Sequence, residues 1–311
     1  MRRSRMGERT VCLAGWALLG LAACSKAPAP PPAAAVPQGP PPAPTLEQVR
    51  SATVSGVLEQ PVTLVDGTYE GPPVAAGAAS RPTLSLWAPS LIFSDLDGAP
   101  GNEAIALLST SSGGSGEFVH VAVFALKDGK AVSLATAPVG DRVQLQKLWV
   151  EHGQIHMDVV EAGPKDPACC PTQISRKVFA LEGGALRPKS SDAVGSLSVN
   201  LLASTDWVLA EMDGQPVDAS GRPPTLLVQY GKVVGFGGCN RYTGPLKESS
   251  PGQISVGPLA STRMACPPAE MELEDKFTSR MNKVTSYTFR AGQLALTWRD
   301  KQGGGLLVFS K

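Results

Sequence analysis

Cysteine is the residue type in this chain that is best suited to chemistry. A thiol can be lipidated, form a disulfide, bind zinc, or act as a nucleophile when a base lies beside it. The chain has six such residues: Cys12, Cys24, Cys169, Cys170, Cys239 and Cys266. The role of each one depends on the segment around it.

Cys24 ends an N-terminal segment of the kind found in secreted proteins. Residues 1–9 carry four Arg, and residues 11–21 form an apolar run broken only by small residues. This run is shorter than the ~20 apolar residues that a membrane-spanning helix needs. The order therefore predicts a secretory signal, with a short anchor or a plain signal peptide as the alternatives to a lipoprotein signal.

The stretch Leu21-Ala22-Ala23-Cys24 resembles the lipobox of bacterial lipoproteins. The resemblance implies that residues 1–23 are removed and that Cys24 then carries a diacylglyceryl group and a further acyl chain such as palmitate. Two or three chains give stable anchoring to a membrane. Because Ser25 follows instead of a retention Asp, we expect a lipid-anchored envelope protein at the outer membrane, facing the periplasm.

A tether is predicted for residues 24–44, which are almost entirely Ala and Pro beyond residue 26. Such a segment cannot form a core, and an extended polyproline conformation would reach roughly 55 Å. A proline-rich ligand for a partner domain is the alternative. The whole chain has 28 Lys+Arg and 27 Asp+Glu, so a nucleic-acid partner is not expected.

Residues 45–190 predict an antiparallel, strand-rich domain behind a short helix that Thr45 would cap. Short apolar runs are joined by Gly, Ser and Asp-Gly turns, which is typical of hairpins. The order of its motifs, ending in Asp166-Pro167-Ala168-Cys169-Cys170-Pro171-Thr172, resembles an uncharacterised domain of secreted bacterial proteins. That resemblance implies no reaction and no ligand.

Three features of this region could do chemistry. The Asp95-x-Asp97-Gly98 stretch is either a calcium loop that lacks a third carboxylate or a plain turn. Cys169 and Cys170 either bond to each other in a strained ring, pair with distant cysteines, or stay as buried thiols. The three histidines either meet at a metal or are structural, and these are His120, His152 and His156.

Residues 203–311 predict a second domain of α+β class. Strands precede and follow one helix over residues 270–284, in which Leu273, Phe277 and Val284 recur at helical spacing. Its acidic residues fall early and its basic residues late, which the helix dipole favours.

This second region resembles the META domain. The resemblance is carried by Trp207-Val208-Leu209, by the stretches over residues 235–242 and 259–267, and by Glu274 and Phe277. It implies an antiparallel sheet wrapped round one helix as a cracked barrel. It also implies bacterial envelope stress or small-molecule resistance, with no enzymatic activity and no cofactor.

Cys239 and Cys266 lie in the motifs that carry this resemblance. A disulfide between them would close a loop of about 28 residues, worth ~3 kcal/mol in the chain-entropy model. A Cys nucleophile lacks a base because the region has no His, and a zinc site lacks a Cys-x₂-Cys pair. Arg241 and Arg263 beside them either contact an anion or ligand or are structural.

The sequence therefore predicts a membrane-anchored envelope lipoprotein that is not an enzyme. We expect it to bind a small apolar ligand, a lipid or an envelope protein, with the open side of the barrel as the site. One alternative is a hydrolase with a site between the two domains. Another is a pilot or assembly factor that binds a partner's peptide along a sheet edge.

Overall fold

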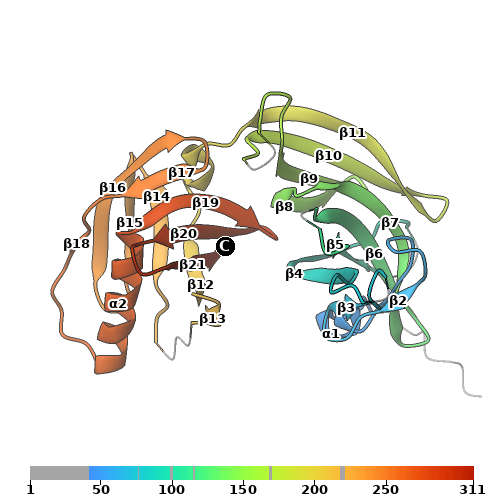
Figure 1. The fold of residues 1–311 in the computed structure, drawn as a ribbon, viewed down its shortest axis with the longest axis horizontal. Helices are drawn as coiled ribbons and strands as arrows, with labels where there is room; N and C mark the ends of the chain where they lie inside the picture. Colours follow the sequence, from blue (N-terminus) through green and yellow to red (C-terminus); the bar gives the residue numbers. More distant parts are fainter. Residues whose placement is uncertain (1–41, 76, 99–100, 115, 168–169, 218–220) are drawn as a thin grey trace, which may run out of the picture. The chain divides into compact units, whose positions relative to one another are not determined.

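Antiparallel β-hairpins build most of the protein (Figure 1). The computed structural model describes residues 42–75, 77–98, 101–114, 116–167, 170–217 and 221–311. Cys24 and the predicted tether up to residue 41 lie outside these ranges. Neither helix in the described ranges combines the length and the apolar character needed to cross a bilayer.

The first sheet has seven strands and follows the predicted hairpins. Its Asp128-Gly129 turn has positive φ at both residues, as the dipeptide predicts. In spatial order the strands are β2 (Val62–Thr63), β1 (Thr53–Val54), β7 (Lys130–Asp141), β6 (Phe118–Lys127), β5 (Glu103–Ser111), β4 (Thr83–Ser94) and β3 (Thr68–Glu70).

The short helix α1 (Leu46–Arg50) begins where the sequence predicts it. The Thr45 hydroxyl accepts a hydrogen bond from the Gln48 N–H at 3.2 Å, and the Gln48 side chain accepts one from the Thr45 N–H at 2.8 Å. This reciprocal capping box satisfies two backbone donors that a helix start leaves open.

The second sheet has four strands, and its last strand corrects a prediction. The order is β11 (Ala185–Ser196), β10 (Gln173–Glu182), β9 (Gln154–Glu161) and β8 (Gln144–Glu151). The sequence predicts that the first domain ends at residue 190, yet residues 190–196 pair with β10 as the end of β11. Strand β11 pairs on one side only and is mostly exposed. It therefore lacks the alternation of apolar and polar residues by which a strand is predicted from sequence.

The third sheet closes on itself. It runs β13 (Gln215–Pro216), β12 (Trp207–Met212), β14 (Thr225–Gln229), β15 (Lys232–Phe236), β16 (Arg241–Ser250), β17 (Gln253–Val256), β19 (Val284–Arg290), β20 (Gln293–Arg299) and β21 (Gly304–Ser310). Strand β21 pairs back to β12, while β17 and β19 share a single pair, Gln253 with Ser286. The short strand β18 (Ala260–Ser261) pairs with β16. This is a cracked barrel, as the resemblance implies.

Helix α2 (Pro268–Met281) packs one face onto the barrel core, with Phe277 and Met281 buried. Phe277 is fully buried, with Tyr242 at 5.6 Å and Phe309 at 6.3 Å between ring centroids. The helix ends at Met281 rather than at residue 284, because Val284 already belongs to β19. The predicted α+β class with one helix inside the C-terminal sheet is confirmed.

We expect Phe277→Ala to lower the free energy of unfolding by about 3–5 kcal/mol, because it leaves a cavity among packed aromatic rings. Ser279→Ala, on the exposed side of the same helix, should stay within about 0.5 kcal/mol of the wild type. Urea unfolding followed by tryptophan fluorescence measures both. Equal effects of the two variants would contradict the packing described here.

Candidate functional site

The carboxylate of Glu274 is the centre of the motif region. Its Oε2 accepts hydrogen bonds from the N–H of Cys239 at 3.0 Å and from the N–H of Asn240, and its Oε1 accepts one from the Asn240 side chain at 3.1 Å. Helix α2 thereby holds the loop between β15 and β16. Bonds of this kind to a charged acceptor are each worth about 1.5–3 kcal/mol.

Asn240 continues the network into the next segment. Its Oδ1 accepts hydrogen bonds from the N–H of Met264 at 2.7 Å and from the hydroxyl of Thr262 at 2.9 Å. The buried Asn240 side chain therefore connects Glu274 to the stretch before helix α2. Two of the three resembling stretches meet at this amide.

Glycine is required where the loop meets the helix. A Cβ on Gly238, whose φ is +126°, would lie 3.2 Å from the Glu270 carbonyl oxygen, and one on Gly237 would lie 3.0 Å from the Glu274 side chain. A Cβ would be crowded at both positions, and the positive φ of Gly238 strains any other residue, so glycine allows the loop to approach the carboxylate closely.

The predicted disulfide between Cys239 and Cys266 is present, with the Cα atoms 5.9 Å apart. It covalently joins the two stretches that Asn240 already connects. Cys239 is buried, so its sulfur is a structural link and not an exposed nucleophile. Cys170 is also disulfide-bonded, whereas Cys169 lies outside the described residues.

Arg241 and Arg263 flank this network but do not enter it. Both side chains are exposed, and within the described ranges neither has an ion pair or a side-chain hydrogen bond. An anion at these residues stays a prediction.

A hollow of about 270 Å³ lies beside helix α2, on the side where the β12–β13 hairpin passes. Apolar side chains of Met212, Val217 and Leu273 line it, and Arg222 and Lys276 are among its charged residues. The barrel interior itself is filled by Phe277, Trp207 and their neighbours. An apolar ligand would therefore have room beside the helix and not among the core side chains.

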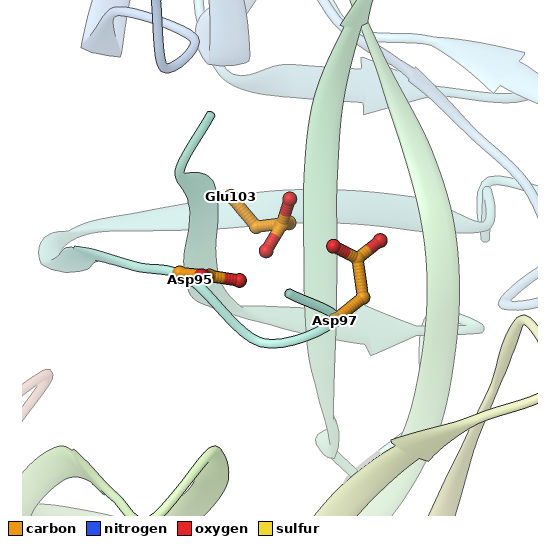
Figure 2. A group of neighbouring side chains, drawn as sticks. All are labelled: Asp95, Asp97 and Glu103. Carbon is orange, nitrogen blue, oxygen red and sulfur yellow. The ribbon is translucent and has the colours of Figure 1, made fainter. Parts of the chain in front are cut away.

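Three carboxylates meet in the N-terminal part (Figure 2). Single oxygens of Asp95, Asp97 and Glu103 lie within 4.8 Å of one another. Glu103 is buried at the start of β5, and its Oε2 accepts the N–H of Leu96 at 2.9 Å. Asp95 accepts the N–H of Gly98 at 2.7 Å, which is the bond of an ordinary turn.

Burial raises the pKa of Glu103, and the neighbouring charges of Asp97 and Asp95 raise it further. The sequence brought Asp95 and Asp97 together, but Glu103 joins them only because the turn folds back onto β5. Protein oxygens suit calcium, yet Ca²⁺ takes six to eight ligands. The three carboxylates offer a start for such a site and are also compatible with a plain turn.

The three histidines do not form a metal-binding group with one another in the described ranges. His120 lies on β6, and burial lowers its pKa. His156 stacks on Trp149 with ring centroids 5.3 Å apart. His152 occupies the positive-φ turn between β8 and β9.

Sequence reasoning missed a second carboxylate that organises the barrel. Asp213 accepts hydrogen bonds from the Trp298 indole at 2.7 Å and from the Arg280 guanidinium at 2.5 Å. These residues are far apart in the chain, and an Asp-Gly turn gives no hint of such partners. Asp213 therefore links the C-terminal end of helix α2 to strand β20.

We expect Glu274→Ala to lower the free energy of unfolding by about 2–4 kcal/mol, because two backbone N–H groups lose a charged acceptor. Glu272→Ala is the matched control, since Glu272 is exposed and its one ion pair among the described residues is with Lys276, and should cost under about 1 kcal/mol. Chemical denaturation of the oxidised protein measures both. A small effect of Glu274→Ala would mean that the loop does not depend on this carboxylate.

Glu103 should make stability fall as pH rises. Its raised pKa means that, above pH 4.5, the folded state keeps a proton that the unfolded state has lost. The stability that Glu103 contributes is therefore complete below the unfolded pKa of 4.5 and is lost as the pH rises through the folded pKa. Glu103→Gln should therefore unfold at a higher temperature than wild type at pH 7 and match it near pH 4. The exposed Glu59→Gln is the control, and an unchanged pH profile for Glu103→Gln would contradict the assignment.

Comparison with known proteins agrees with this geometry. The model of the META domain family matches residues 200–311. Heat shock protein HslJ of Escherichia coli (strain K12) is 29% identical over 91 residues, which are 29% of this chain and 64% of HslJ, so the match spans less than two thirds of that protein.

Two structures solved by NMR are also similar. One is 26% identical and covers 37% of this chain and 94% of its own, with a TM-score of 0.31. The other, from Burkholderia xenovorans, is 27% identical and covers 40% and 95%, with a TM-score of 0.30. The assignment rests on the family match and on the strand pairing, not on these scores. Residues 200–311 of this chain form a META domain, similar to HslJ.

Proposed function

We propose that the protein is a non-catalytic lipoprotein of the bacterial envelope with a role in stress. Its META domain would bind a small apolar ligand, a lipid or an envelope protein. The observation that carries the non-catalytic part is that the reactive groups of the motif are already engaged. Glu274 accepts three hydrogen bonds, and Cys239 is disulfide-bonded.

A hydrolase would need a nucleophile next to a base. Residues 200–311 contain no histidine, and the Glu274 carboxylate beside Cys239 accepts hydrogen bonds from backbone N–H groups. These facts favour binding over catalysis for this domain.

The envelope location is supported by the lipobox-like stretch before Cys24 and by the similarity to HslJ. A disulfide inside the META domain fits an oxidising compartment outside the cytosol. The stress role is proposed because the relative is named a heat shock protein.

The ligand site that we propose is the hollow beside helix α2. Its lining combines apolar side chains with charged ones, as a site for a small amphipathic molecule would, and its volume of about 270 Å³ is slightly below the range of typical small-molecule sites. A small ligand would fit better than a large one.

Intact-mass measurement of the protein extracted from native membranes without reductant tests the anchor. We expect a mass that corresponds to cleavage before Cys24 plus acyl chains. Retention of residues 1–23 without added lipid would overturn the lipoprotein proposal. Mass that is lost on denaturation would reveal a bound ligand.

Leu273→Trp tests the hollow, because the larger side chain would fill it from helix α2. We expect at least a tenfold loss of ligand retained in native mass spectrometry, with the fold intact. Ser279→Trp, on the exposed side of the same helix, should retain the ligand. Equal retention by both variants would place the ligand elsewhere.

A further inference from the structure

One outer face of the META barrel is built on strands whose exposed charged side chains are basic. On β15 and β16 side chains alternate between the core and solvent, and the exposed positions include Lys232, Arg241 and Lys247. Within the described ranges none of these three cations has an ion pair. We call the outward surface of β14, β15 and β16 the basic face.

The strands that carry this face are poor in acidic residues. The five strands from β14 to β18 contain no Asp and one Glu, Glu248. The Glu248 carboxylate accepts the N–H of Val199 at 3.0 Å, and within the described ranges it has no ion pair with Lys247. Since the chain as a whole is nearly neutral, the basic face is a local separation of charge and not a reflection of composition.

The centre of the basic face is apolar. Leu227 pairs with Val234, and Phe236 pairs with Arg241, so half-buried apolar side chains stand between the cations. The Arg222 guanidinium lies 4.8 Å from the centroid of the Phe236 ring. A surface with apolar residues among unpaired cations suits a partner that has anionic groups at its surface and an apolar layer below them.

Tyr230 stands at the tip of the β14–β15 hairpin and is 97% exposed. Its φ of +50° is in the left-handed region, which is unfavourable for a bulky residue and in such turns is usually occupied by Asn or Gly. An aromatic side chain is therefore kept fully exposed in a strained position. Tyr is typical of the interface between a membrane and water, where its ring is buried and its hydroxyl stays wet.

We propose that the basic face docks onto an anionic lipid surface, with Tyr230 at the interface. The proposal rests on the proposed lipid anchor, because a tether that reaches roughly 55 Å would keep the domain close to the bilayer and raise its effective concentration there. Each Lys or Arg near an anionic membrane raises affinity about fivefold. Three such cations give a factor on the order of 100 at low salt.

The test is sedimentation of the protein with vesicles. The part of the chain that the structure describes begins at residue 42, so a chain that begins at Ser25 keeps every described element and lacks the lipid. We expect it to bind vesicles of equal parts phosphatidylglycerol and phosphatidylethanolamine, and not vesicles of phosphatidylcholine. Added salt should weaken the binding.

The variant that tests the face combines Lys232→Glu, Arg241→Glu and Lys247→Glu. It should lose at least 50-fold in vesicle affinity. The control combines Lys127→Glu, Lys130→Glu and Lys301→Glu, three exposed lysines elsewhere in the chain, and has the same net charge. It should bind nearly as well as the unmodified chain.

Tyr230→Asn separates docking from folding. Asn tolerates the left-handed conformation, so the melting temperature should rise while vesicle affinity falls several-fold. Equal affinity of the two charge-reversed chains, or equal binding to both vesicle types, would overturn the proposal. Capture by polyglutamate without vesicle binding would assign the face to an acidic protein and would also overturn it. If the intact mass shows no lipid on Cys24, the lipoprotein proposal is overturned. The vesicle result stands separately, because it is measured on a chain that lacks the lipid.

Discussion

The hydrogen bonds of the Glu274 carboxylate are the interaction on which the META barrel depends. One side chain on helix α2 fixes the loop between β15 and β16 by accepting two backbone N–H groups and one amide. Backbone groups in a buried loop must find partners, and no strand is available there to supply them. The glycines before Cys239 allow the approach, and Asn240 passes the constraint on to the segment that precedes the helix.

The same constraint explains why the motif is not a catalytic centre in our interpretation. A catalytic carboxylate or thiol must be available to react with the substrate. Glu274 instead accepts hydrogen bonds from backbone N–H groups, and Cys239 forms a disulfide with Cys266. The disulfide and the hydrogen bonds join the same pieces of chain. We therefore propose that function is carried by surfaces around this frame, namely the hollow beside α2 and the basic face on the opposite side of the sheet from the core.

Charge and packing place these surfaces differently. The interior of the barrel takes the large apolar side chains, with Phe277 at its centre. Alternation along β15 and β16 then leaves Lys232 and Arg241 on the outside. In the N-terminal part, by contrast, a charged group is buried. Glu103 lies in the sheet beside Asp95 and Asp97, so its ionised form lowers the stability of the folded protein and its protonated form does not.

The sequence by itself determined the α+β class, the capping of α1 by Thr45 and the helix in the C-terminal domain, and it offered the disulfide between Cys239 and Cys266 as one of several possibilities that the structure then decided. Each depends on local patterns or on motifs with specific residue types. Only the tertiary structure decided that the carboxylate of Glu103 lies beside those of Asp95 and Asp97. It also decided that Asp213 accepts hydrogen bonds from Trp298 and Arg280, and that β11 continues to Ser196. These features arise from contacts between distant segments or from an exposed edge strand, and neither leaves a periodic signal in the chain.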